Sequence, residues 1–214
     1  MFQSSILAQP SPRRSFVGLL VIVLAAVGME LAYRSWKSSE QTANSSLPRF
    51  GVVPEFSLID HEGRPFGSKD LHGKVWIADF IATRSSGPDP ILSSRFAELD
   101  TNFKKSEQLR LISFTVDPQN DTPGVLRDYA RRFEASPRWY FLTGDKQKVD
   151  ELAGNGFQLA ARDPNNVSSE QVRTTKFVLV DADGAIRGYY DGTSNEVIQR
   201  LLTDLGSLLR VGGR

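Results

Sequence analysis

The chain of 214 residues contains no cysteine, which excludes more functions than any other feature of its composition. Without thiols it forms no disulfide, has no thiol nucleophile and holds no metal or iron–sulfur cluster through thiolates. Only two histidines, His61 and His72, are present, so a metal site built of imidazoles alone is also excluded. The two methionines, Met1 and Met29, precede the part of the chain that reads as a folded domain. Soft sulfur ligands are therefore absent from that domain.

A charge imbalance is lacking as well. Lysine and arginine number 26 against 25 aspartates and glutamates, and the formal net charge is +1. A chain so close to neutral does not favour a nucleic-acid partner. Hydrophobic residues make up 40% of the sequence, and 13 phenylalanines supply large side chains for a core. We expect one globular domain with appendages and no nucleic acid among its partners.

Residues 16–36 predict a single transmembrane anchor. Positions 16–29 are apolar without interruption, close to the roughly 20 residues that a helix needs to span a bilayer. Tyr33 and Trp36 follow, where interfacial aromatic residues belong. The next segment, residues 37–50, is small and polar and predicts a flexible linker.

Arg13 and Arg14 precede the apolar run, and no acid occurs in the first fifteen residues. This pattern favours a cytoplasmic segment at residues 1–15 and a C-terminal domain on the periplasmic side of the cell inner membrane. Two alternatives remain open. The apolar run could belong to a cleaved signal peptide, although no small-x-small cleavage site is evident, or the arginine pair could direct twin-arginine export.

From residue 51 to residue 210, short apolar runs alternate with amphipathic segments. This alternation predicts a mixed sheet with helices on both faces. The tight turn at 181–184 ends in Asp-Gly, which accepts positive φ and favours a hairpin. The expected strands are 54–60, 64–66, 75–82, 109–116, 139–143, 176–180 and 185–190, and the expected helices are 90–105, 123–133, 146–153 and 195–209.

The segment after the strand at 75–82 is a Gly/Pro turn that leads into a helix. Thioredoxin-like folds carry their reactive cysteines at such a turn, and here it has none. Several motifs accompany this plan, and their order resembles that of the Sco/SenC family. They are Leu92-Ser93-Ser94-Arg95-Phe96-Ala97-Glu98-Leu99, Asp117-Pro118-x-x-Asp121-Thr122-Pro123, Trp139-x-Phe141-Leu142-Thr143-Gly144 and Lys176-Phe177-Val178-Leu179-Val180-Asp181.

The resemblance implies a thioredoxin-like domain that handles copper during assembly of cytochrome c oxidase. The family ligands are a C-x-x-x-C pair in the turn and a histidine shortly before the Phe-Val-Leu-Val-Asp strand. Aligning the turn places Ser85 and Asp89 at the cysteine positions, and counting back from Phe177 places Arg173 at the histidine position. Serine and aspartate do not select Cu(I), and arginine stays protonated and repels a cation. We therefore expect no copper and no other cofactor.

Asp89 and Arg173 carry opposite charges at two positions that the metal would join, so we expect them to form an ion pair. Ser85 and Ser86 are interpreted as capping or turn residues, because no histidine is predicted nearby to activate a nucleophile. Turn and cap roles are also favoured over cation binding for the acids that end strands, namely Asp117, Asp121 and Asp181. Either Asp121 or Thr122 is expected to be the N-cap of the helix at 123–133.

Two further predictions concern groups close to the turn. His61 and His72 are interpreted as solvated loop histidines. Asp79 lies inside an apolar strand, where burial could raise its pKa, and we expect it to make a structural hydrogen bond or to occupy an edge position.

The preferred function is a membrane-anchored, non-catalytic binding or accessory factor of respiratory oxidase assembly, without enzymatic activity. Its expected partners are the membrane, through residues 16–36, and an oxidase subunit or another assembly factor. The alternative is a copper chaperone for cytochrome c oxidase that uses ligands other than those of the family. An enzyme with oxygen- or nitrogen-based chemistry lacks a recognisable set of acid, base and nucleophile.

Overall fold

The computed structural model describes residues 27–30, 47–159, 167–168, 171–172 and 174–212. Residues 27–30 are helical, and no helix in the described part of the chain is long and apolar enough to cross a membrane. The rest of the predicted anchor and the predicted linker as far as residue 46 lie outside the described residues, as does Arg173.

Leu47–Arg214 forms a compact unit. It therefore begins before residue 51, where the sequence predicted the domain to start. The buried guanidinium of Arg187 explains this boundary, because it donates hydrogen bonds to the carbonyls of Leu47 (2.7 Å) and Pro48 (3.1 Å). These residues, assigned to the linker from their composition, are held against the domain.

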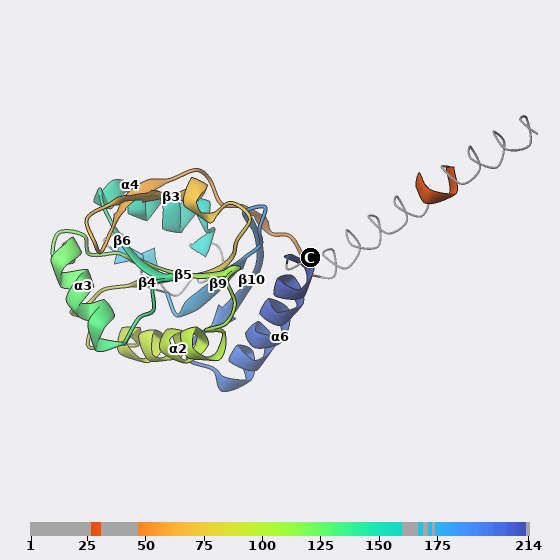
Figure 1. The fold of residues 1–214 in the computed structure, drawn as a ribbon. Coiled ribbons are helices and arrows are strands. Elements are labelled where there is room, and N and C mark those ends of the chain that lie inside the picture. The colour runs from red at the N-terminus through yellow and green to blue at the C-terminus, as the bar shows by residue number, and fades with distance from the viewer. Residues whose placement is uncertain (1–26, 31–46, 160–166, 169–170, 173, 213–214) are drawn as a thin grey trace, which may run out of the picture. The chain divides into compact units, whose positions relative to one another are not determined.

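An eight-stranded mixed sheet is the centre of this unit, with the strand order β1-β10-β9-β4-β5-β6-β2-β3 (Figure 1). The neighbours β4, β5 and β6 run parallel, and the other pairs are antiparallel. The strands are β1 (Gly51–Val52), β2 (Ser57–Asp60), β3 (Pro65–Gly67), β4 (Val75–Ile81), β5 (Leu109–Thr115), β6 (Trp139–Thr143), β9 (Lys176–Val180) and β10 (Ala185–Asp191), and β7 (Val167–Ser168) pairs with β8 (Gln171–Val172) in a separate hairpin.

Helices cover both faces of the sheet, as predicted (Figure 1). One face packs against α2, α3 and α6, and the other against α4 and the π-helical turn η2 that continues it. The helical elements are η1 (Ser68–Leu71), α2 (Asp89–Asn102), α3 (Pro123–Arg132), α4 (Lys146–Glu151), η2 (Leu152–Gly156) and α6 (Asn195–Gly212).

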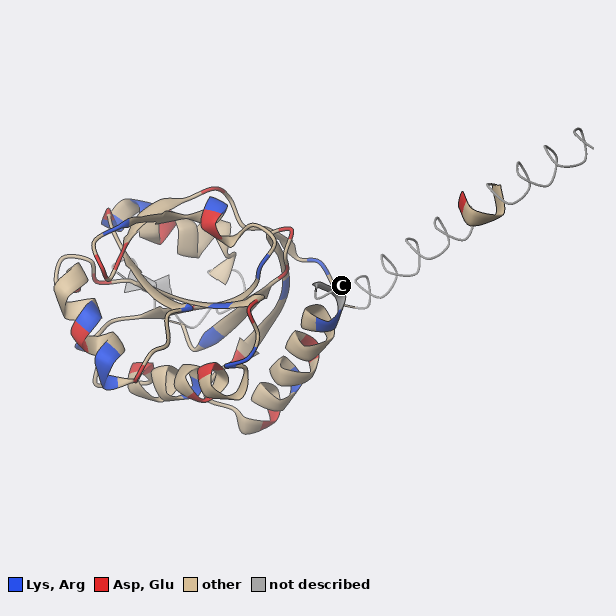
Figure 2. Ribbon diagram, in the orientation of Figure 1, with Lys and Arg blue, Asp and Glu red and all other residues tan. Residues whose placement is uncertain are grey.

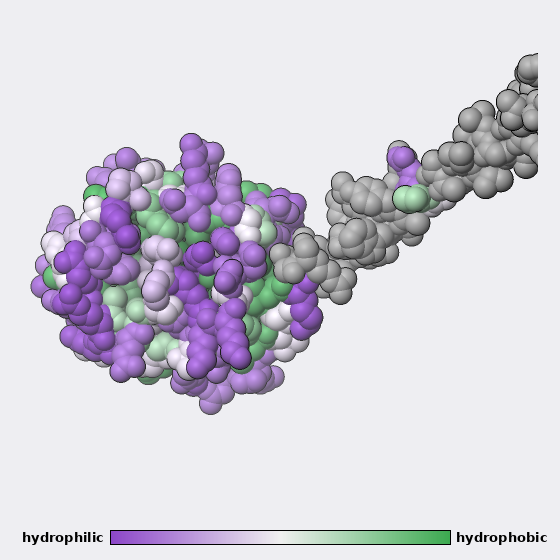
Figure 3. All heavy atoms as spheres, in the orientation of Figure 1, coloured by the Kyte–Doolittle hydropathy of each residue, from purple (hydrophilic) through white to green (hydrophobic). Residues whose placement is uncertain are grey.

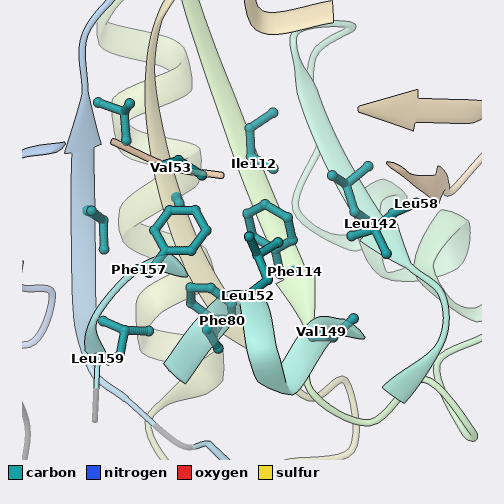
Figure 4. Packing of buried hydrophobic residues seen from close by; sticks show 14 of the residues in the cluster. Val53, Leu58, Phe80, Ile112, Phe114, Leu142, Val149, Leu152, Phe157 and Leu159 are labelled. Atoms are coloured by element: carbon teal, nitrogen blue, oxygen red, sulfur yellow. The ribbon is translucent and has the colours of Figure 1, made fainter. Parts of the chain in front are cut away.

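Strand β4 is buried along its whole length because its two faces serve two separate cores. Val75, Ile77 and Ile81 face the helices α2, α3 and α6. Phe80 points to the other side, where its ring lies 5.1 Å from that of Phe114 and 5.2 Å from that of Phe157 between centroids (Figure 4). Such a strand reads as a continuous apolar run in the sequence, which is the pattern of a sheet covered on both sides.

The outer surface of the domain is mainly hydrophilic on the face seen in Figure 3, with smaller hydrophobic areas between the polar side chains. Among the large hydrophobic residues that remain exposed are Ile91, at 54%, and Val125, at 39%. Both belong to the first turns of helices that follow the parallel strands β4 and β5.

Candidate functional site

The site turn, residues 82–88, joins the carboxyl end of β4 to α2. Because β4 and β5 run parallel with Ile81 opposite Thr115, the site turn lies beside the loop that follows β5. The buried Asp121 connects the two. Its carboxylate accepts hydrogen bonds from the Thr83 backbone N–H (3.1 Å), the Thr83 hydroxyl (2.5 Å) and the Thr115 hydroxyl (2.5 Å). The base of the site is thus fixed by a buried acid whose charge is satisfied by hydrogen bonds.

Ser85 and Asp89 are both used to hold the site turn closed. The Ser85 hydroxyl accepts a hydrogen bond from the Gly87 N–H (3.2 Å), which confirms its predicted role in turn formation. One carboxylate oxygen of Asp89, Oδ2, accepts from the Ala82 N–H (2.9 Å), across the width of the turn. Of the two predicted roles, turn formation is therefore the one observed for Ser85, since Pro88 occupies the N-cap position of α2.

The residues present do not fit copper. At the two described positions the ligand atoms would be a hydroxyl and a carboxylate, which are hard oxygen donors and do not select Cu(I). Both Ser85 Oγ and Asp89 Oδ2 already accept backbone hydrogen bonds within the turn. The third mapped position, Arg173, lies outside the described residues.

The ion pair between Asp89 and Arg173 stays a prediction. Asp89 Oδ2 is engaged with Ala82, which leaves Oδ1 as the oxygen that could accept from the guanidinium. A double-mutant cycle with Asp89→Asn and Arg173→Gln, followed by urea unfolding, measures the coupling. We expect about 1–2 kcal/mol for a partly shielded, charge-assisted pair. A coupling energy of zero within error would contradict the pair.

The other acids near the ends of strands have structural roles, as the sequence analysis preferred. Asp117 accepts from the Asn120 side-chain amide (2.9 Å) and forms an ion pair with Arg84 (3.5 Å). Asp181 accepts from backbone N–H groups in its hairpin turn and forms a buried ion pair with Arg187 (2.7 Å). Within the described residues, no group of three or more histidine, aspartate or glutamate side chains is placed to hold a metal ion.

Asp79 differs from what the sequence predicted. It lies in the central strand β4 rather than at an edge, and it is fully buried. Within the described residues neither carboxyl oxygen has a donor in good hydrogen-bonding geometry, although the Ser113 side chain lies close to it. Burial raises the pKa of Asp79 to about 8; the nearby Ser113 side chain, opposite it in β5, offsets part of the rise, and the charge of Asp89 adds to it. The burial of Asp79 and the direction of its pKa shift agree with the sequence interpretation, whereas the expected hydrogen bond is not formed within the described residues.

The two histidines also differ from each other. His72 is exposed, as expected. The prediction of a solvated side chain is wrong for His61, which is only 15% exposed. Its Nδ1 accepts a hydrogen bond from the Phe141 N–H (3.3 Å), and its ring lies edge-on to that of Phe141. Burial lowers the pKa of His61. As a neutral acceptor it satisfies the N–H of Phe141 in the middle of β6, next to the residues of β6 that pair with β2.

Comparisons with known proteins agree with this architecture. Residues 44–209 match the SCO1/SenC family model. The SCO1 protein homolog of Bacillus subtilis is 30% identical over 158 residues, which cover 72% of this chain and 81% of the relative. The structure of BsSco, a member of the Sco family of cytochrome c oxidase assembly proteins, aligns with a TM-score of 0.65 at 28% identity, covering 77% of this chain and 97% of BsSco. The solution structure of the soluble domain of Sco1 from Bacillus subtilis gives 0.56 at 29% identity, covering 74% and 94%.

Proposed function

The chain belongs to the SCO1/SenC family, and we propose that it is a membrane-anchored accessory factor of respiratory oxidase assembly that has lost the copper and redox site. In this role it binds an oxidase subunit or another assembly factor through the surface of its domain. It carries no copper and catalyses no reaction. The domain lies on the periplasmic side of the inner membrane, and residues 16–36 hold it there.

The observation that carries this proposal is the replacement of sulfur at the site. The chain has no cysteine at any position, so neither thiolate ligation nor thiol–disulfide exchange is available to it. The site turn nevertheless keeps a defined shape, because Ser85 and Asp89 accept hydrogen bonds from backbone N–H groups within it. A turn closed in this way supports recognition by shape rather than transfer of a metal ion.

Copurification tests the proposed role. The full chain with a C-terminal tag is expressed in its own host, crosslinked in intact membranes and purified, and its partners are identified by mass spectrometry. We expect an oxidase subunit or an oxidase assembly factor to be enriched with the full chain. The matched control is residues 1–46 fused to an unrelated soluble domain, which keeps the predicted anchor and linker but lacks the unit Leu47–Arg214.

Two results of the copurification contradict the proposal. One is recovery of the same partners with the control, which assigns binding to the anchor rather than to the domain. The other is the absence of every oxidase-related protein from the crosslinked full chain when the host is producing its oxidase.

A further inference from the structure

We propose that a basic concavity at the end of the sheet opposite the site turn binds phosphate-bearing anions. The concavity has a volume of about 450 Å³. It lies where the parallel strands β4, β5 and β6 begin and where α2 ends, whereas the site turn follows the end of β4. The residues that line it are Lys74, Lys104, Ser106, Glu107, Arg110, Ser136, Pro137 and Arg138.

Three of the basic residues in this concavity form no ion pair with a described carboxylate, unlike many other basic residues on the domain. Figure 2 shows acidic and basic residues interspersed on α2, α3 and α6, and several of the basic ones are within ion-pair distance of a carboxylate, such as Arg95 with Glu98 and Arg131 with Asp128. Lys74, Lys104 and Arg110 form no such pair with any carboxylate in the described part of the chain. Three positive charges are thus gathered without a structural counter-ion.

Their hydrogen bonds to the protein leave donors available for a ligand. The Lys74 ammonium donates to the Glu107 backbone carbonyl (3.3 Å). The Arg110 guanidinium donates to the Glu107 carbonyl (2.9 Å) and, through the same nitrogen, to the Leu109 carbonyl (2.8 Å). An ammonium group has three donors and a guanidinium five, so both side chains retain N–H groups after these contacts.

Stabilisation of the α2 carboxyl end does not account for the cluster. Lysines often occur near the last turn of a helix because they complement its dipole. Here Arg138 already satisfies carbonyl groups at and just beyond the end of α2, because it donates hydrogen bonds to the carbonyls of Asp100, Phe103 and Ser106. Arg138 is itself neutralised by the Asp100 carboxylate (2.7 Å). Lys104 is therefore not needed to stabilise the end of α2, and its ammonium group can contact a ligand in the concavity.

The chemistry of the lining favours a phosphate group. The cations Lys74, Lys104 and Arg110 face one acid, the exposed Glu107, so the concavity has an excess of positive charge. A guanidinium fork and two ammonium groups suit an anion with several oxygen acceptors. Free phosphate and the phosphodiester of an anionic lipid headgroup share this chemistry, and the experiment below separates the two sources.

The experiment uses residues 47–214, which contain both hydrophobic cores of the domain. The soluble domain of the Bacillus subtilis relative has been solved in solution, which supports the independent folding of this unit. Binding is measured to inorganic phosphate by NMR titration, and to phosphatidylglycerol vesicles by sedimentation against phosphatidylcholine vesicles. The test variant is Lys74→Gln/Lys104→Gln/Arg110→Gln. The control is Lys69→Gln/Lys148→Gln/Arg200→Gln, which removes the same charge from cations outside the concavity that also form no ion pair with a described carboxylate.

We expect the test variant to lose about 100-fold in affinity, because each of the three cations contributes about a factor of five near an anionic surface. The control should lose less than about fivefold, as expected for a distant and screened charge. Circular dichroism and thermal unfolding establish that both variants are folded. Binding to phosphate, to vesicles or to both supports the site and identifies the source of the anion.

The absence of binding to either probe overturns the proposal, and so does an equal loss in the two variants, which would assign any affinity to overall charge. The concavity would bind phosphate whether or not the domain docks on an oxidase factor. A negative copurification and a negative titration therefore contradict different claims.

Discussion

Replacing Ser85 and Asp89 with cysteine and Arg173 with histidine is expected to create a copper site. The triple variant Ser85→Cys/Asp89→Cys/Arg173→His restores two thiolates and one imidazole at the mapped family positions. Soft thiolate ligands select Cu(I), so we expect affinity for Cu(I) to rise by roughly a thousandfold or more over the wild-type domain, with one ion bound per chain. Competition with a chromophoric Cu(I) chelator under reducing conditions measures the change.

The scaffold should accept these substitutions because the contacts that fix the base of the site turn do not involve the substituted residues. The Asp121 carboxylate, with its bonds to Thr83 and Thr115, fixes the base of the site turn independently of Ser85 and Asp89. Ser85→Cys removes the acceptor of the Gly87 N–H, which lies in the exposed part of the turn, where water can replace it. Asp89→Cys removes the acceptor of the Ala82 N–H, which belongs to a buried residue. The cost in stability should be about 1 kcal/mol for the bond to Gly87 and about 1–3 kcal/mol for the bond to Ala82, because its N–H would be left buried without its acceptor.

The matched control moves one thiol by a single position. The variant Ser86→Cys/Asp89→Cys/Arg173→His has the same ligand types but a C-x-x-C spacing, and Ser86 is exposed in the turn. We expect it to bind Cu(I) at least tenfold more weakly than the triple variant, since geometry as well as ligand type sets metal affinity. Equal binding by the two variants would show that the positions were mapped wrongly, as would a triple variant no better than the wild type.

Replacing Asp79 with asparagine is expected to stabilise the domain at neutral pH. The wild-type carboxyl group is fully buried, lacks a hydrogen-bond partner and has a pKa raised to about 8 by burial. Its ordinary value is 3.8. Between these two values the unfolded chain releases a proton that the folded protein retains, so the free energy of unfolding falls as pH rises.

The size of this effect follows from the shift in pKa. One unit corresponds to about 1.4 kcal/mol, so we expect Asp79 to lower the free energy of unfolding by about 2–4 kcal/mol at pH 7, relative to a group that does not titrate. This decrease in the free energy of unfolding should be absent below pH 4 and constant above pH 8. Asparagine has a similar shape and no charge, so Asp79→Asn should remove the penalty and its pH dependence. Urea unfolding of both proteins from pH 4 to pH 9 measures it.

Other groups titrate in the same pH range and contribute equally to both proteins. The difference in the free energy of unfolding between the wild type and Asp79→Asn at each pH therefore reports on Asp79 alone. His61, whose pKa is lowered by burial, contributes a slope of opposite sign that is common to both proteins. The control is Asp128→Asn, which removes an exposed carboxylate paired with the exposed Arg131 and should change stability by less than about 1 kcal/mol. A wild-type protein and an Asp79→Asn variant with parallel pH profiles would contradict the assignment.

Much of the fold could be predicted from the sequence because its main elements carry strong local patterns. The central strands β4 and β5 are rich in apolar residues, β6 and β9 have the expected bounds, and the Asp-Gly turn has Gly184 at φ +77°. The site turn was located correctly because it lies between a buried strand and a helix. Short elements were missed, since strands of two residues such as β1 and β7 show no periodicity.

The parts of the site that could not be predicted depend on contacts between distant segments. Asp121 or Thr122 was expected to cap α3, and Thr122 does so. The contact of Asp121 with Thr83, 38 residues away, was not predicted. His61 lies in a turn, as expected, but its side chain is shielded by its contact with Phe141 of β6, which comes 80 residues later in the chain. For Asp79, the apolar strand indicated burial correctly, but sequence alone could not reveal that a buried carboxyl lacks a partner.

Titration of the wild-type domain, residues 47–214, with Cu(I) tests the central claim most directly, because the proposed function depends on a scaffold without soft ligands. We predict no stoichiometric site, and only weak binding of the kind that any exposed carboxylate gives. A single tight site on the wild-type chain would contradict the account and would favour a copper chaperone that uses ligands other than those of the family.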